Sequence, residues 1–334
     1  MRATPLVQKP AAFPRPRGGA GAARPSAPAV AKPVSIARSL NQAGFTGWAD
    51  GFAFTSFGVR IGIRVDQPGF SGVLQSILPP GHRPTSSSVL ERLYSLVLGG
   101  STLEDGTEDL YVLYDGAERL ARDHELPRML KVLEAHIRRT VAEIAPRRVF
   151  VHAGVIEHGG RAIVIPGHSM TGKSTLVFEL IKLGASYYSD EYAVLDEKGM
   201  VSPFAKPLSL RAPGTYASSD HVVEQFGATA GVKPVPVGLV AITHYAAGAK
   251  WRPRRLSAGN GALTLLAHSI AARRHPERVL STLHRALANA EIVKGPRGEA
   301  AEVAHQMLEV LDRTSGITSE RARLPFETLH RRGK

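Results

Sequence analysis

The pattern of hydrophobic and polar residues changes its period near residue 126. Between residues 59 and 65, valine or isoleucine occupies every second position and alternates with arginine or glycine. That period of two predicts a half-buried strand. The apolar stretches at 90–98 and 110–114 predict two more, and Asp115-Gly116 suits a hairpin turn. Between 126 and 144 the spacing becomes helical. Strands followed by this helix predict a small α+β domain over residues 45–147. The predicted core positions of the helix are Leu126, Leu130, Leu133, Ile137 and Val141.

A second set of elements begins near residue 148, where strands and helices alternate. Apolar stretches at 149–155 and 162–165 flank the turn residues Gly159-Gly160 and predict a pair of strands. A loop at 167–174 precedes a helix over 176–183, which Gly184 ends. The remaining predicted elements are strands at 187–188, 193–195 and 237–244, then helices at 259–272, 276–290 and 299–311.

The last third of the chain is thus predicted to be helical. Two leucine stripes would face the core, Leu263, Leu266 and Ile270 from the first of these helices and Leu280, Leu283 and Leu287 from the second. The whole region, residues 148–313, is predicted to be an α/β domain.

The two ends of the chain differ from its middle in composition. Residues 1–44 are rich in Ala, Pro, Gly and Arg and contain few large apolar residues. Such a segment buries too little surface to offset its ordering entropy, so we expect disorder there. A targeting peptide is the alternative, although an amphipathic helical pattern is missing. Residues 314–334 are predicted to form a basic C-terminal tail.

Most of the net charge of +13 lies in these ends. Residues 1–47 hold seven basic residues and no acidic one, and the last fourteen residues carry +4, which leaves +2 for residues 48–320. A nucleic-acid binder usually carries its basic patch on the folded surface, interleaved with aromatic residues, and these make up only 6% here. The distribution of charge therefore predicts no specific nucleic-acid partner. The tails are expected to increase solubility or to attract anions weakly.

The absence of some residue types and segments excludes several protein classes. With no cysteine, the chain can have no disulfide framework, thiolate zinc site or cysteine nucleophile. It has no run of 18 apolar residues and no compact apolar stretch behind Arg2, so we expect neither a membrane span nor a secretory signal. These features together predict a cytoplasmic protein without a membrane partner.

The sharpest chemical signal is the segment from Gly167 to Ser174, which matches the phosphate-binding pattern G-x-x-x-x-G-K-[ST]. Its glycines let successive backbone N–H groups point at phosphate oxygens, and the following helix directs its positive end to the same place. Lys173 would add a point charge, and the Ser174 hydroxyl can ligate Mg²⁺. The predicted ATP-binding residues are Gly167, His168, Ser169, Met170, Thr171, Gly172, Lys173, Ser174 and Thr175.

Asp190 and Glu191 are predicted to lie at the end of the strand that follows this helix. Ligands bind at such strand ends in open α/β sheets. Behind a phosphate-binding loop, the two carboxylates can divide the work: Asp190 would hold Mg²⁺ and Glu191 would accept a proton from an attacking hydroxyl. The alternative is a solvated acidic turn.

Three further features are ambiguous when judged by sequence alone. His152 lies in an apolar strand, where a histidine is usually a hydrogen-bonded core residue. Arg211 can pair with a phosphate or lie on a surface loop. The basic and aromatic segment 251–255 fits an anionic partner or a solvated loop equally well.

Residues from about 149 to 312 resemble the catalytic domain of bacterial HPr kinase/phosphorylase and, more closely, its diverged HPr-kinase-like relatives. The resemblance implies a nucleotide-binding fold similar to that of phosphoenolpyruvate carboxykinase, with Mg²⁺ and ATP as cofactors, and often a homo-oligomer. It is carried by Val151-His152-Ala153-Gly154-Val155, Gly167 to Ser174, Ser189-Asp190-Glu191 and Leu208-Ser209-Leu210-Arg211.

The family's functional residues carry over position by position. Its strand histidine matches His152, which the resemblance therefore places in the site. Its loop serine, its lysine and its metal-binding serine match Ser169, Lys173 and Ser174.

The family's tandem aspartates match Asp190 and Glu191, and the second of them is its proton acceptor. Its signature arginine matches Arg211. The sequence departs from the family pattern at several points: Ser209 replaces a metal-binding glutamate, Met170 replaces a loop glycine, and Ala212-Pro213-Gly214 replaces a glycine-rich continuation after the arginine. The family's later proline–arginine segment, tied to its phosphorylase reaction, has no match here.

The function predicted is an Mg-ATP-dependent kinase that phosphorylates a hydroxyl, and the acceptor would be a serine of a protein or peptide partner. His152, Lys173, Asp190, Glu191 and Arg211 would be the catalytic residues, with Ser174 and Asp190 at the metal. Two alternatives stay open. One is an ATP-binding regulatory or assembly module without transferase activity, which the missing glutamate suggests, and the other is a small-molecule kinase.

Overall fold

The structure is a computed structural model that describes residues 34–35, 47–98, 111–169, 171–211 and 218–321, with backbone alone after residue 314. Most of the predicted disordered segment 1–44 and of the basic tail 314–334 lies outside the described residues. Within the first segment, β1 (Val34–Ser35) pairs with β5 (Val89–Leu90). The described chain has a mixed α/β fold with two main sheets.

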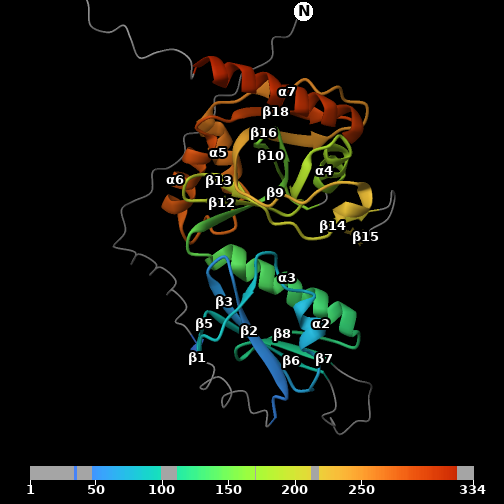
Figure 1. Cartoon of the computed structure of the whole chain (residues 1–334), viewed down its shortest axis with the longest axis vertical. Helices are drawn as coiled ribbons and strands as arrows, with labels where there is room; N and C mark the ends of the chain where they lie inside the picture. Colours follow the sequence, from blue (N-terminus) through green and yellow to red (C-terminus); the bar gives the residue numbers. More distant parts are fainter. Residues whose placement is uncertain (1–33, 36–46, 99–110, 170, 212–217, 322–334) are drawn as a thin grey trace, which may run out of the picture. The chain divides into compact units, whose positions relative to one another are not determined.

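The first sheet has six strands in the order β4-β2-β3-β6-β7-β8. Figure 1 labels β2, β3, β6, β7 and β8 of this sheet in the blue to green part of the chain. β3 and β6 are parallel, and the other neighbours are antiparallel. The strand predicted at 59–65 is confirmed, and Gly116, with φ 59°, makes the predicted turn between β7 and β8. The strands are β2 (Asp50–Ser56), β3 (Val59–Val65), β4 (Arg83–Pro84), β6 (Arg92–Val97), β7 (Tyr111–Asp115) and β8 (Glu118–Asp123).

The strand predicted at 90–98 is divided at Glu91 into β5 and β6. The Glu91 carboxylate accepts a hydrogen bond from the backbone N–H of Arg60 at 2.7 Å and pairs with the Arg60 guanidinium. The Glu91 backbone N–H also donates to the Arg60 carbonyl at 2.9 Å, so the ion pair adds to the backbone contact at that point. The short helix α2 (Ser71–Gln75) follows β3.

Helix α3 (Leu126–Ile144) has the predicted bounds. Leu133, Ile137 and Val141 are fully buried as predicted, because they recur on one face at helical spacing. That face packs in one hydrophobic core with the first sheet and with Phe150 on β9. α3 therefore contacts both the first sheet and the strand that begins the second.

The second sheet has eight strands along the path β10-β9-β12-β13-β16-β18-β17, with β11 beside β9. β10 also pairs with β16 in parallel, so part of the path closes on itself. The hairpin predicted around Gly159-Gly160 is confirmed between β9 and β10. The strands are β9 (Arg148–His158), β10 (Arg161–Pro166), β11 (Ser186–Ser189), β12 (Tyr192–Asp196), β13 (Met200–Ser202), β16 (Val235–Tyr245), β17 (Arg254–Arg255) and β18 (Glu291–Arg297).

Helices cover this sheet with two separate hydrophobic cores. One core joins α4 and α7 to β10, β16 and β18, and the other joins α5 and α6 to β9, β12 and β16. The helices are α4 (Lys173–Lys182), α5 (Ala258–Ala267), α6 (Pro276–Leu287) and α7 (Ala300–Arg321). Within the described part of the chain, no helix is long and apolar enough to cross a membrane.

The all-helical prediction for the last third is wrong at residues 291–297, which form β18 parallel to β16. This strand contains Lys294, Gly295 and Pro296, so its sequence shows no period of two. The basic and aromatic segment 251–255 is likewise no simple loop, because Trp251 is buried and Arg254–Arg255 forms β17.

The leucine stripes predicted for α5 and α6 are also wrong in part. Leu263 is 62% exposed and Leu280 is 41% exposed, whereas Leu265 and Val279 are buried. Gly261 explains the rotation of α5, because a Cβ at that position would collide with Ile292 of β18. A glycine on the inward face lets α5 approach the sheet closely, and a count of leucines does not detect it.

Candidate functional site

The glycine-rich loop, residues 167–174, connects the end of β10 to the start of α4. Gly172 adopts a left-handed backbone conformation, with φ 79°, directly before the first helical residue, Lys173. A left-handed conformation costs free energy for a residue with a Cβ, because the Cβ crowds the backbone, so glycine is favoured here. The helix then starts with free N–H groups at the loop, which is the arrangement that attracts an anion.

Lys173 folds back onto the loop that precedes it. Its Nζ donates to the His168 carbonyl at 2.5 Å, and the Thr171 hydroxyl donates to the same oxygen at 2.9 Å. Burial lowers the pKa of Lys173, and the nearby Asp190 and Glu191 oppose that shift. Among the described loop residues, the His168 carbonyl therefore holds the Lys173 ammonium, a contact that an anionic ligand can replace.

Arg297, at the end of β18, forms hydrogen bonds with the backbone of the loop. It is 3% exposed, and its Nη2 donates to the carbonyls of Gly172 at 3.0 Å and Thr171 at 3.4 Å. Its guanidinium also lies over the Tyr245 ring. A buried arginine with these contacts fixes the backbone just before α4.

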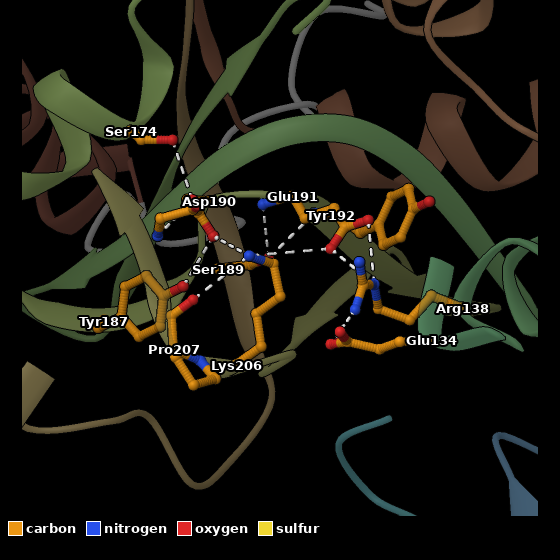
Figure 2. A network of polar contacts seen from close by, with 11 residues as sticks. Glu134, Arg138, Ser174, Tyr187, Ser189, Asp190, Glu191, Tyr192, Lys206 and Pro207 are labelled. Carbon is orange, nitrogen blue, oxygen red and sulfur yellow. Dashed lines mark hydrogen bonds and ion pairs between the residues drawn. The ribbon is translucent and has the colours of Figure 1, made fainter. Parts of the chain in front are cut away.

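Asp190 lies immediately after β11 and is 7% exposed. It joins the acidic side of the site to the loop, since the Ser174 hydroxyl donates to its Oδ2 at 2.9 Å (Figure 2). The other donors to its carboxylate are the Tyr187 hydroxyl at 3.0 Å, the Ser209 backbone N–H at 3.3 Å and the Lys206 ammonium at 3.1 Å. Burial and the Asp190 charge raise the pKa of Tyr187 well above its ordinary value, so this phenol stays a donor.

Glu191 extends away from Asp190 toward α3. Its carboxylate pairs with the Arg138 guanidinium at 3.1 Å and lies 3.9 Å from the Lys206 ammonium. Arg138 also pairs with Glu134 one turn earlier on α3, which holds the arginine in place. Figure 2 shows the Lys206 nitrogen between the two carboxyl groups and Arg138 on the far side of Glu191.

His152 is half-buried on β9, with its ring 4.9 Å from the Tyr192 ring. Burial lowers the pKa of His152, and the Glu191 charge opposes this. Two other histidines lie close by: the backbone N–H of His152 donates to the backbone carbonyl of His268 at 2.8 Å, and the His268 ring lies 4.6 Å from that of His168.

Several of these groups line one cavity of about 400 Å³. Nine of the predicted site residues meet there, together with three that the sequence did not predict. The predicted ones are His152, Ser169, Gly172, Lys173, Ser174, Thr175, Asp190, Glu191 and Arg211, the last of them exposed at the end of β14 (Leu208–Arg211). Of the other loop residues predicted to bind ATP, Gly167, His168 and Thr171 do not line the cavity, and Met170 lies outside the described residues.

The three lining residues that sequence reasoning missed are Arg138, Lys206 and Ser209 as a backbone donor. Arg138 stands on the polar face of an amphipathic helix, where an arginine ordinarily points to solvent. Lys206 precedes a proline in an irregular segment between β13 and β14. Lys206 stands two residues before Leu208–Arg211, a segment that carries the family resemblance. That position was the one sequence feature that could have indicated a place in the site.

The donor set fits a magnesium ion. The Ser174 hydroxyl and the Asp190 carboxylate offer adjacent hard oxygen ligands, and Mg²⁺ is usually held by one or two such groups plus waters and phosphate. Among the described residues, no cluster of three or more His, Asp or Glu side chains could hold a metal by itself. The site is therefore suited to a metal that arrives with a phosphate ligand.

No protein-family model matches this chain, and no curated protein does. One solved structure that aligns with it is the Hpr(Ser) kinase/phosphatase from Coxiella burnetii, at 18% sequence identity and a TM-score of 0.30. The alignment covers 51% of this chain and 98% of that one. At this score the likeness is weak and assigns no function.

Proposed function

We propose that this chain binds Mg-ATP and transfers the γ-phosphate to a hydroxyl group, with a serine of a protein or peptide as the acceptor. The observation that carries the proposal is the hydrogen bond of 2.9 Å between the Ser174 hydroxyl and Asp190. It joins a glycine-rich loop of phosphate-binding sequence to a pair of carboxylates within one cavity.

The loop would bind the β- and γ-phosphates. Its glycines bring backbone N–H groups inward, and α4 adds the positive end of its dipole. Lys173 would leave the His168 carbonyl for a phosphate oxygen, which is the stronger acceptor because it is charged. Arg297 would keep the backbone before α4 fixed during this exchange.

Ser174 and Asp190 would hold the magnesium ion. When bound, Mg²⁺ neutralises the charge that builds up on the phosphate oxygens. Tyr187 and the Ser209 N–H keep Asp190 oriented toward Ser174. The buried Asp190 would therefore position the magnesium ion, which leaves the Glu191 carboxylate for proton transfer.

Glu191 would act as the general base. As the acceptor hydroxyl oxygen forms its bond to the γ-phosphorus, the bond from phosphorus to the β-bridging oxygen breaks and ADP leaves. The hydroxyl proton passes to the Glu191 carboxylate. Arg138 fixes this carboxylate at 3.1 Å, and the exposed Arg211 and half-buried His152, which line the same cavity, would contact the transferring phosphate.

An ATP-binding module without transferase activity is the second candidate. The observation in its favour is Lys206, whose ammonium lies 3.1 Å from Asp190 and 3.9 Å from Glu191. A cation at that point offsets the charge of both carboxylates without a metal. Ser209 stands where the resembled family has a metal-binding glutamate, which points in the same direction.

The test compares ATP binding by calorimetry, with Mg²⁺, for the full chain and for Lys173→Ala. Loss of the lysine should weaken ATP binding by between about tenfold and a hundredfold. Lys182→Ala on the same helix is the matched control, since Lys182 pairs with Glu179 outside the cavity. This variant should bind ATP with the affinity of the natural chain. No ATP binding by the natural chain would contradict both candidates.

Glu191→Gln separates the two candidates. In a kinase this change should reduce turnover of γ-labelled ATP by about 10²- to 10⁴-fold and leave ATP affinity nearly unchanged. A non-catalytic module would bind ATP but show no turnover that depends on Glu191. Measurable turnover that is equal in the natural chain and Glu191→Gln would reject Glu191 as the base.

A further inference from the structure

Lys206 occupies a central position between the two carboxylates of the site. Its Nζ lies 3.1 Å from Asp190 Oδ1 and 3.9 Å from Glu191 Oε2, and it donates to the Pro207 carbonyl at 3.3 Å. The side chain is 16% exposed. The ammonium therefore lies next to three oxygens, of which the Glu191 oxygen is beyond hydrogen-bond distance (Figure 2).

This position is the one in which a positive charge is most needed when no metal is bound. Asp190 is 7% exposed, and a buried carboxylate requires a nearby cation or several donors. The Lys206 ammonium lies near both acids, whereas Arg138 pairs with Glu191 and not with Asp190 among the ion pairs of the described residues. The two acids are therefore already compensated in the arrangement seen here.

A divalent ion bound through Asp190 would be close to this ammonium. Two cations that share one carboxylate repel each other, so binding of the metal would favour movement of Lys206. Lys206 can move, because its flexible four-carbon stem lines the cavity together with Lys173 and Arg211. Its nearest new partner in that cavity would be a phosphate oxygen.

We propose that Lys206 is a tethered cation, which holds Asp190 and Glu191 while the metal is absent and turns to a phosphate group of the ligand when a divalent ion binds. This rests on the proposed function, because it assigns Lys206 to the same site. It makes Lys206 a competitor of the metal in the absence of phosphate and a partner of the phosphate in its presence.

Binding of Mn²⁺ without nucleotide tests the first half. Free Mn²⁺ is measured by electron paramagnetic resonance in titrations of the full-length chain, Lys206→Gln and Lys206→Arg. Removal of the competing charge should tighten Mn²⁺ binding on the order of tenfold in Lys206→Gln. Lys206→Arg should stay near the natural affinity, as should the control Lys182→Gln, which loses the same charge outside the cavity. Equal or weaker Mn²⁺ binding by Lys206→Gln would overturn the proposal.

Binding of tripolyphosphate tests the second half, by calorimetry with and without Mn²⁺. In Lys206→Gln we expect tripolyphosphate affinity to fall by roughly five- to tenfold when Mn²⁺ is present and to change less without it, while the affinity for Mn²⁺ alone rises. A purely structural lysine would not produce opposite effects in one folded variant, and circular dichroism with thermal melting checks the fold. If tripolyphosphate affinity is unchanged, Lys206 does not turn to phosphate and the proposal fails.

The two proposals can fail separately. Tripolyphosphate binding that is insensitive to Lys173→Ala would contradict the phosphate-binding loop, whereas the Mn²⁺ titration contains no phosphate and still tests Lys206. Conversely, if Lys206→Gln binds Mn²⁺ with unchanged affinity, the proposed role of Lys206 is wrong and the kinase proposal is unaffected.

Discussion

The Arg138 guanidinium on α3 lies 3.1 Å from the Glu191 carboxylate, which follows β11. Arg138 is 16% exposed and is itself held by Glu134 on the preceding turn. The helix that covers the first sheet thus supplies a charge to the cavity of the second. Glu191 is oriented by a residue that stands 53 positions earlier in the sequence.

Arg138→Gln should therefore lower the rate of phosphoryl transfer more than it lowers ATP affinity. Without the guanidinium the Glu191 carboxylate is free to rotate, and misplacement of a base by about 1 Å can cost roughly a hundredfold in rate. We expect kcat to fall by about ten- to a hundredfold, with the KM for ATP within about twofold, measured by turnover of γ-labelled ATP. Arg139→Gln, an exposed neighbour on α3, is the control. A rise in the KM for ATP with unchanged kcat would contradict a positioning role.

Gly172→Ala should affect the loop through Arg297. Gly172 has φ 79°, and an added Cβ would collide with the Arg297 guanidinium. Gly116→Ala is the matched control, because Gly116 has φ 59° but nothing within 4 Å of the added Cβ. Both variants should lose about 1–2 kcal/mol of unfolding free energy to backbone strain.

Only Gly172→Ala should also weaken ATP binding, by roughly tenfold or more, because Arg297 must move and release the loop carbonyls. Chemical denaturation measures the unfolding free energy, and calorimetry measures ATP binding. Equal ATP affinity in the two variants would show that the contact between Arg297 and Gly172 does not shape the loop.

The position of the acidic pair could be predicted from sequence, because it depends on local pattern. Asp190 follows a strand that begins after the α4 helix ends at a glycine, and each of these steps has a short-range signal. Lys206 and Arg138 reach the pair only through tertiary structure. A lysine before a proline and an arginine on a polar helix face ordinarily indicate solvent, and their sequence neighbours give no contrary sign.

The same distinction explains the errors in the fold. α3 was predicted to the residue because its apolar face is continuous and packs as a whole. β18 was missed because it has only Ile292 and Val293 as adjacent buried aliphatic residues, and its burial comes from β16 beside it. Leu263 was misassigned because the orientation of α5 depends on the close approach of Gly261 to Ile292.

The exposure of Leu263 gives a stability prediction. Leu265→Ala on α5 should lower the free energy of unfolding by about 2–4 kcal/mol, because it leaves a cavity where Leu265 is 2% exposed. Leu263→Ala should stay within about 0.5 kcal/mol of the natural chain, because Leu263 is 62% exposed. Urea denaturation followed by circular dichroism measures both. The reverse order would mean that the leucine stripe, and not the glycine, orients the helix.

The stability of the chain should fall as the pH drops below about 6.5, the ordinary pKa of an unfolded histidine. Burial lowers the pKa of His152 and of His268, and the charges of His168 and Lys173 lower both further. The unfolded chain then binds more protons than the folded chain in this window, so the unfolding free energy decreases with falling pH. Above the window the effect vanishes, because both states are neutral.

Replacement of one histidine should reduce this dependence. His268→Gln removes a group whose pKa is lowered, so its unfolding free energy should change less between pH 7 and pH 5 than that of the natural chain. His284→Gln, at an exposed position on α6, is the control variant. Urea titrations at several pH values within this window measure the slope. A steeper slope in His268→Gln would mean that the histidine is stabilised as a cation in the folded chain, against the burial seen here.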